Sequence, residues 1–96
     1  MSCLHIISKS PGSGVWQDCR KTVAARDCIL LTEDGIYHGS LPGGLEQMPK
    51  SVKLYALRDD VQARGMGDRL SPAAKLIGFD EFVELCCKYD KTVSWF

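Results

Sequence analysis

The sequence lacks an excess of charge of either sign. Its 96 residues include 12 basic and 12 acidic side chains, so the formal net charge at neutral pH is zero. Proteins that hold nucleic acids by the phosphate backbone carry a concentrated positive charge, whereas the densest basic cluster here is the pair Arg20-Lys21. We therefore expect no direct nucleic-acid binding.

Long hydrophobic runs are missing as well. No apolar stretch approaches the ~20 residues that a membrane-spanning helix needs. The first residues also show no basic segment followed by a long apolar segment, which a signal peptide would have. These two absences predict a cytoplasmic protein that does not interact with a membrane.

Cysteine is present, but without the spacing of a disulfide framework or a metal site. The chain has five cysteines, an odd number, at Cys3, Cys19, Cys28, Cys86 and Cys87. No Cys-x-x-Cys pair occurs, so in a chain that is not exported we expect reduced thiols and neither a metal nor a cofactor. Cys3 and Cys28 lie in apolar runs and are predicted to be small core residues, and Cys86 is predicted on the core face of the last helix.

Short apolar runs alternate with helical patterns along the chain. Runs of aliphatic, β-branched and aromatic residues predict strands at 3–8, 28–32, 52–57, 75–78 and 92–96. Helical patterns occur at 15–25, 58–65 and 81–89, and the ambiguous stretch 36–45 holds a short helical turn at most. The alternation predicts one α/β domain over residues 1–96, a doubly wound and mostly parallel sheet of four to five strands with helices on both faces, as in flavodoxin-like proteins.

Short polar side chains stand where the predicted helices begin. Ser13, Asp59 or Asp60, and Asp80 could each accept hydrogen bonds from the first amides of a helix. Gly65 could end the middle helix, because glycine adopts the left-handed conformation without steric cost.

Three motifs point weakly to a ligand site. Gly12-Ser13-Gly14 between a strand and a helix could cradle a phosphate, although the glycines also fit a flexible turn. The pairs Glu33-Asp34 and Asp59-Asp60 follow strands, where carboxylates could bind Mg²⁺ or accept a phosphoryl group, but helix capping and turn formation explain these residues more simply. His5 and His38 fall into no triad spacing, so we interpret His5 as a hydrogen-bonded core residue.

Cys19 is the candidate catalytic residue, with a possible role as a sulfur carrier. It lies within the first predicted helix beside Arg20 and Lys21, whose positive charges would favour a thiolate. It also lies between Val15 and Val23 on the apolar side of that helix, which is the pattern of a buried, unreactive thiol. Spacing alone leaves both interpretations open.

Several segments together resemble the DsrH/TusB family of small sulfur-relay subunits. The similar segments, in chain order, are Leu4-His5, Ser10-Pro11, Asp34-Gly35-Ile36-Tyr37, Leu54-Tyr55-Ala56-Leu57 with Asp60, Ala63-Arg64-Gly65, Phe79-Asp80, Phe82-Val83 with Leu85, and Ser94-Trp95-Phe96. The resemblance covers nearly the whole chain, and its order and spacing carry more weight than any single segment.

The resemblance implies a DsrE-like fold and a place in a sulfurtransferase complex. It implies two paralogous partners, a TusC/DsrF-like subunit and a TusD/DsrE-like subunit, assembled as a dimer of heterotrimers. Such complexes pass persulfide sulfur toward 2-thiouridine at the tRNA wobble position, or handle sulfur in dissimilatory sulfur oxidation. The main persulfide cysteine belongs to the TusD/DsrE-like partner, and Cys19 falls where the DsrH branch has a cysteine.

Two alternatives remain open from the sequence. The chain could be a homo-oligomeric flavodoxin-like domain that binds a phosphate-bearing ligand at Gly12–Gly14, or a scaffold subunit without chemistry of its own. The apolar tail of Val93, Trp95 and Phe96 predicts a surface covered by a neighbour, and packing into the chain's own core is the other interpretation of Trp95.

Overall fold

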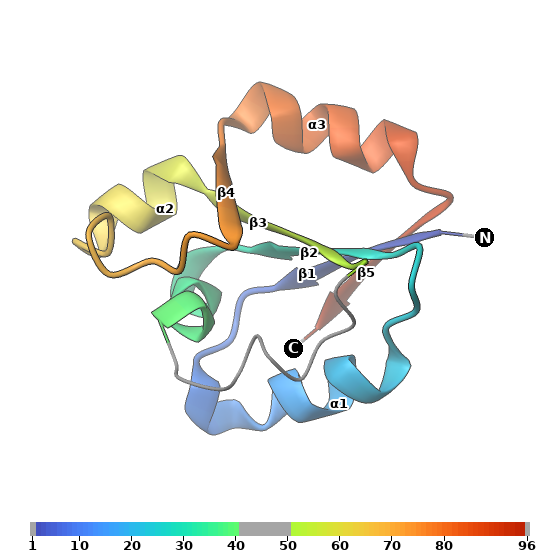
Figure 1. Cartoon of the computed structure of the whole chain (residues 1–96), viewed down its shortest axis with the longest axis horizontal. Coiled ribbons are helices and arrows are strands. Elements are labelled where there is room, and N and C mark those ends of the chain that lie inside the picture. Colours follow the sequence, from blue (N-terminus) through green and yellow to red (C-terminus); the bar gives the residue numbers. More distant parts are fainter. Residues whose placement is uncertain (1, 41–50, 96) are drawn as a thin grey trace.

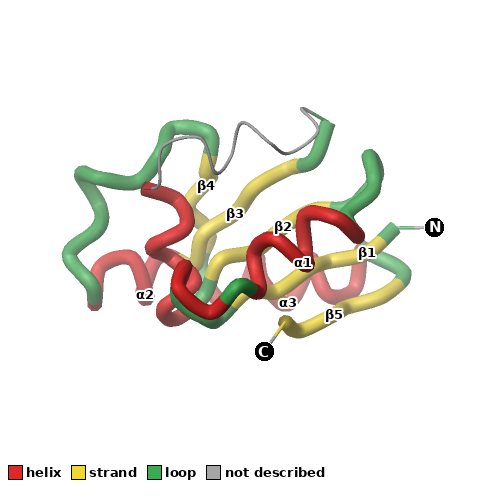
Figure 2. Tube along the Cα trace, turned by 90° about the horizontal axis from the view of Figure 1, so that it is seen from below, coloured by secondary structure: helices red, strands yellow, loops and turns green. Residues whose placement is uncertain are grey.

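All five strands form one parallel sheet. The computed structural model of the chain describes residues 2–40 and 51–95. The strands are β1 (Cys3–Ile7), β2 (Cys28–Leu31), β3 (Lys53–Leu57), β4 (Ala74–Ile77) and β5 (Lys91–Trp95). They are ordered β4-β3-β2-β1-β5, an order that Figure 2 shows from below, and every neighbouring pair is parallel. The α/β class and the parallel sheet predicted from the alternating pattern are confirmed.

Helices cover both faces of this sheet. Three α-helices and two 3-10 helices occur among the described residues: η1 (Pro11–Ser13), α1 (Val15–Thr22), η2 (Glu33–Ser40), α2 (Arg58–Ala63) and α3 (Phe79–Lys88). Helix α1 lies on one face and α3 on the opposite face, while α2 lies beyond the end of β3 (Figure 1). Strand β2 is therefore covered from both sides, and all four of its residues are buried, as expected of a continuous apolar run.

The sheet separates two hydrophobic clusters. The cluster on the α1 face includes Ile7, Val15, Cys19, Ile29 and Leu31. The cluster on the α3 face consists of Leu4, Cys28, Leu30, Ile77 and Leu85. Because neighbouring residues of a strand point to opposite faces, Ile29 and Leu31 join one cluster while Cys28 and Leu30 join the other.

The predicted N-caps are wrong in their details. Helix α2 begins at Arg58 directly after β3, with Leu57 in the cap position and no side-chain cap. Helix α3 begins at Phe79, so Asp80 lies inside its first turn. In α1 the cap position is Gly14, at φ 80°, although the Ser13 hydroxyl does accept a long 3.4 Å hydrogen bond from the Val15 amide. The predicted helix end at Gly65 is confirmed by its left-handed φ of 61°.

Helix α1 ends three residues earlier than predicted, at Thr22. Val23 is extended, and the next amide, that of Ala24, donates to the Asp27 carboxylate at 2.9 Å. This side-chain acceptor replaces the helical carbonyl, so the chain turns away from α1 and enters β2.

The stretch after β2 is more regular than predicted. Residues 33–40 form the 3-10 helix η2, whereas the sequence predicted a short turn at most; residues 41–45 of that prediction lie outside the described residues. Gly35 explains why this segment can pack against the end of β1, because a Cβ atom there would overlap the carbonyl oxygen of Ile7. Only glycine permits that approach.

Candidate functional site

Cys19 lies on the side of α1 that faces the sheet. Its side chain is fully buried in the cluster that also holds Val15 and Ile29. The neighbouring Arg20 is partly exposed and Lys21 is exposed, so the two charges that the sequence places beside Cys19 point away from the apolar face. The burial agrees with the interpretation of Cys19 as a core thiol, and the carrier role stays a prediction.

The electrostatic surroundings of Cys19 favour the protonated thiol. Burial raises the pKa of Cys19 to about 12, and the nearby Cys3 and Asp27 add to this increase because they disfavour a second negative charge. At neutral pH the thiolate is therefore a very small fraction of the population. A nucleophilic role would require α1 to move and expose the sulfur atom.

A hydrogen-bonded group of three side chains lies on the same face of the sheet. The Nε2 atom of His5 is 2.8 Å from Asp27 Oδ2, and the indole Nε1 of Trp95 donates to His5 Nδ1 at 3.1 Å. These contacts place the ring proton on Nε2, where it is donated to the carboxylate. Both nitrogens of His5 are engaged and the side chain is buried, so His5 is a structural residue in this state, as predicted.

Asp27 joins this group to the backbone. Its carboxylate also accepts hydrogen bonds from the amides of Cys3 and Ala24, at 3.0 and 2.9 Å. Burial by itself would raise the pKa of Asp27, but the hydrogen bonds from Ala24, His5 and Cys3 outweigh it, and the net effect is a lowered pKa. Asp27 is therefore an ionised carboxylate, and both of its oxygen atoms accept hydrogen bonds from within the chain.

Sequence reasoning missed the pairing of His5 with Asp27. In the parallel register Leu4 lies opposite Cys28, which places Asp27 beside Cys3, two residues from His5 on the same face. The available signal was an acidic residue directly before the most buried strand. To predict the His5–Asp27 pair from this signal, one must know that β2 is the neighbour of β1 in the sheet.

A second aromatic pair lies between α1 and η2. The rings of Trp16 and His38 are stacked, with centroids 4.9 Å apart, and His38 Nε2 is 3.0 Å from the carbonyl oxygen of Lys9. Burial lowers the pKa of His38 despite that hydrogen bond, so the ring is neutral at pH 7. Within residues 2–40 and 51–95, Trp16 Nε1 and His38 Nδ1 are buried polar atoms without a hydrogen-bond partner.

The acidic pairs at the strand ends are engaged in local structure. Asp60 Oδ2 accepts a 2.8 Å hydrogen bond from the Glu33 amide, and Arg64 bridges Asp34 and Asp60 at 3.2 and 3.9 Å. In the described part of the chain, no three His, Cys, Asp or Glu side chains are grouped so that they could hold a metal ion. Phosphate binding at Gly12–Gly14 stays a prediction.

The remaining thiols divide between core and surface. Cys28 is fully buried, as predicted, and burial raises its pKa to about 11; Cys3 is partly buried. Cys86 is exposed, like Cys87, so the predicted core position of Cys86 is wrong. The side of α3 that packs against the cluster consists of buried Leu85 and partly buried Phe82 and Tyr89, and it does not include Cys86.

The apolar tail contributes to the core of the chain itself. Trp95 packs partly buried against the α1-face cluster and stacks on His5, while Val93 remains exposed. Phe96 lies outside the described residues. No helix in the described ranges is both long enough and apolar enough to cross a membrane.

Comparisons with known proteins agree over almost the entire chain. The profile of the family described as "DsrH like protein" matches residues 9–92. The chain is 34% identical to "Protein TusB" of Pectobacterium carotovorum over 94 residues, and 44% identical to "Protein TusB" of Buchnera aphidicola over 95 residues. Each match covers 96% of this chain and 99% of the relative.

A solved structure shares the fold. The crystal structure of the ychN protein from E. coli superposes with a TM-score of 0.79 and covers 99% of this chain and 100% of that protein. The sequence identity of that pair is 19%, so the likeness concerns the arrangement of the parallel sheet and its helices.

Proposed function

Since the chain belongs to the DsrH family of sulfur-relay subunits, we propose that it is a subunit of a cytoplasmic complex that passes persulfide sulfur toward 2-thiolation of the tRNA wobble uridine. The observation that carries this proposal is that the DsrH family profile and relatives named Protein TusB both match this chain over nearly its full length. That name is the one given to the subunit of the tRNA branch, which favours tRNA over sulfur oxidation as the destination.

The proposed partners are one TusC/DsrF-like and one TusD/DsrE-like subunit. The outer surface of the chain offers apolar side chains for such contacts, because Phe79 and Val83 on α3 are 63% and 48% exposed. These two residues are four positions apart in a helix and therefore lie on the same side of it. Exposed apolar side chains that lie together on one surface often belong to a protein–protein interface, which supports α3 as the proposed contact surface.

Within the complex, we propose a scaffolding role for this subunit. The burial of Cys19 and its raised pKa support this role, because the thiolate and not the thiol attacks sulfur. As a carrier, Cys19 would attack the outer sulfur of a donor persulfide, the donor thiolate would leave, and an acceptor thiolate would then take the sulfur in the same way. The exchange is balanced and needs no external oxidant.

One experiment tests the complex and the role of Cys19 together. The tagged chain would be isolated from its native cells, and the recovered proteins analysed by intact mass under non-reducing conditions. We expect two small paralogous partners and normal levels of thiolated tRNA with the unaltered chain and with Cys19→Ser. A lone homo-oligomer, or unchanged tRNA thiolation after deletion of the gene, would contradict the relay proposal.

Cys28→Ser is the matched control, because Cys28 is equally buried but lies in the cluster on the opposite face. If Cys19→Ser abolishes sulfur transfer while Cys28→Ser preserves it, and both variants still assemble, then Cys19 is a carrier and the scaffold role is wrong. Mass analysis would then locate one added sulfur atom at Cys19 in the unaltered chain.

A further inference from the structure

A pocket of about 360 Å³ lies where the first three strands begin. Its walls include Ser2 before β1, Asp27 before β2, and Ser51 and Lys53 at the start of β3, and the end of α3 closes it at Lys88 and Tyr89. In parallel sheets, ligand sites normally lie at the carboxyl ends of the strands. This pocket is at the other edge and is separate from the Cys19 thiol, which does not line it.

The pocket brings together three basic side chains from three different elements. Arg26 comes from the turn before β2, Lys53 from β3 and Lys88 from the last turn of α3. None of the three forms an ion pair with another described residue. Lys88 also suits the negative end of a helix, but Arg26 and Lys53 lie on no helix, so capping does not explain the cluster.

Among the described lining residues one is acidic, Asp27, and both of its oxygen atoms already accept hydrogen bonds within the chain. The donors are His5 and the amides of Cys3 and Ala24, and among the described residues Asp27 forms no ion pair with any of the three cations. Summing the formal charges of the described lining residues gives +2, from three cations and one carboxylate.

Two hydroxyl groups complement this charge. The Ser2 oxygen accepts the Asp90 amide at 3.3 Å, which leaves its proton free to donate, and the exposed Ser51 supplies a second hydroxyl on the opposite wall. Cations together with neutral donors are the groups that hold phosphate oxygens.

We propose that this pocket binds the phosphate monoester of a nucleotide. A phosphate monoester carries a charge of about −1.5 to −2 at neutral pH, which matches the charge of the walls. A volume of about 360 Å³ exceeds what a lone phosphate fills and lies within the range of small-molecule pockets. The same group occurs in a free nucleotide and at the 5′ end of an RNA strand, so the test separates these sources.

The test uses the purified full chain and four probes: AMP, adenosine, inorganic phosphate and a short 5′-phosphorylated single-stranded RNA. We expect AMP to bind and adenosine, which lacks the phosphate, to bind at least tenfold more weakly. Tighter binding of the phosphorylated RNA than of AMP would identify an RNA end as the source, and tighter binding of AMP a free nucleotide. Chemical-shift perturbation should centre on Arg26, Lys53 and Lys88.

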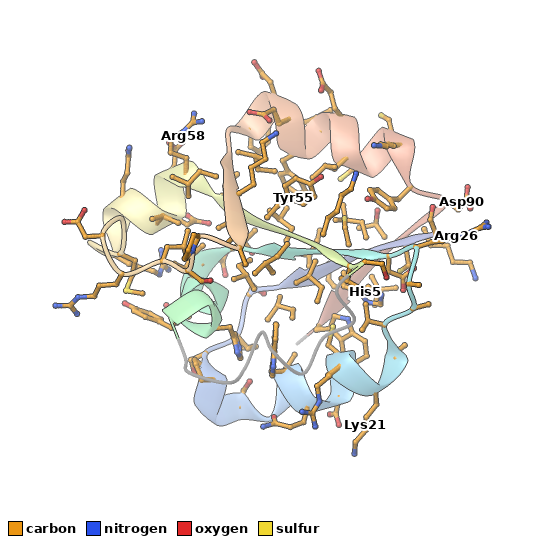
Figure 3. The ribbon with its side chains drawn as sticks, in the orientation of Figure 1. His5, Lys21, Arg26, Tyr55, Arg58 and Asp90 are labelled. Carbon is orange, nitrogen blue, oxygen red and sulfur yellow. The ribbon has the colours of Figure 1, made fainter. Side chains whose placement is uncertain are left out.

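Charge-removing variants make the proposal falsifiable. Arg26→Gln, Lys53→Gln and Lys88→Gln should each weaken binding of AMP by about fivefold to tenfold, because each removes one charge-assisted contact. Lys21→Gln removes the same charge from α1, away from the pocket (Figure 3), and should leave the affinity unchanged. All four side chains are exposed, so folding should be preserved, and thermal unfolding would verify this.

Three outcomes would overturn the proposal: no binding of any phosphate probe up to about 10 mM, equal binding of adenosine and AMP, or an equal loss of affinity in Lys21→Gln. The inference does not rest on the sulfur relay, since it concerns binding by the isolated chain. Recovery of the partner subunits could therefore succeed while this test fails, or the reverse.

Discussion

The two faces of the sheet bury very different side chains. On the α1 face, His5, Asp27 and Trp95 form a hydrogen-bonded group inside the core, and Trp16 stacks on His38 nearby. The α3 face is covered by an apolar cluster that includes Leu30 and Leu85. A buried polar group is costly unless it is paired, so the α1 face needs satisfied hydrogen bonds in addition to its own apolar cluster, whereas the α3 face rests mainly on the removal of apolar surface from water.

The two covering helices differ in the same way. Helix α1 buries Trp16 and Cys19 and leaves its charged residues outside. In helix α3 the one buried residue is Leu85, and Phe79 and Val83 are exposed. Among the described residues, the outer side of α1 is thus mostly charged or polar, whereas α3 exposes the two apolar side chains Phe79 and Val83. Three predictions test this difference.

The largest effect is expected at Asp27. Asp27→Ala should lower the free energy of unfolding by about 3 kcal/mol, because His5 and two backbone amides lose their acceptor in a buried position. Urea unfolding followed by circular dichroism would measure the change. Asp90→Ala is the control, since the exposed Asp90 accepts only the Ser2 amide at 3.0 Å and should cost about 0.5 kcal/mol.

The Asp27 interaction also has a defined pH dependence. Because the folded state lowers the pKa of Asp27 below its usual 3.8, the stabilisation is fully present above that value and is lost as pH falls through the folded pKa. The difference between the unaltered chain and Asp27→Ala should therefore shrink in acid. Equal stability of both proteins at neutral pH would refute the role given to this carboxylate.

The next effect compares two residues of α3. Leu85→Ala should cost about 2 kcal/mol, because Leu85 is buried against the sheet. Val83→Ala, two positions away on the exposed side, should cost less than about 0.5 kcal/mol in the isolated chain. If Val83→Ala keeps the stability of the isolated chain but prevents recovery of the partner subunits, α3 is an interface. A large loss of stability from Val83→Ala would contradict its exposed position.

The smallest effect is expected from His38. Burial keeps the pKa of His38 below its usual 6.5, so the unfolded chain takes up a proton before the folded chain does. The stabilisation is complete above pH 6.5 and falls with decreasing pH, by at most about 1.4 kcal/mol per pH unit. Urea unfolding at several pH values, with His38→Gln as reference, should show this loss only in the unaltered chain; parallel curves would contradict it.

Local sequence patterns located the elements well but their ends poorly. The apolar run 28–31 is so continuous that burial on both faces follows from it directly, and Gly65 marked the end of α2. The end of α1 depended on Asp27, whose carboxylate takes the Ala24 amide. The sequence does not show that the Asp27 carboxylate binds the Ala24 amide in place of a helical carbonyl, because this depends on the position of the turn before β2.

For the candidate site, too, the sequence predicted one part and the tertiary structure decided the other. Cys19 could be selected from the sequence, and its apolar neighbours correctly suggested a core position. The charges of Arg20 and Lys21, which seemed to favour a thiolate, proved ineffective, because burial dominates the pKa of Cys19. The His5–Asp27 pair joins residues 22 positions apart in the sequence, and only the pairing of β1 with β2 reveals it.

By itself, the sequence determined the parallel α/β fold, the family and the identity of the candidate thiol, because these depend on short-range periodicity and on the order of motifs. Only the tertiary structure decided that Cys19 is buried, that Asp27 holds His5, and that Arg26, Lys53 and Lys88 line one pocket. Such properties depend on the register and order of strands, β4-β3-β2-β1-β5, which brings together residues that lie far apart along the chain.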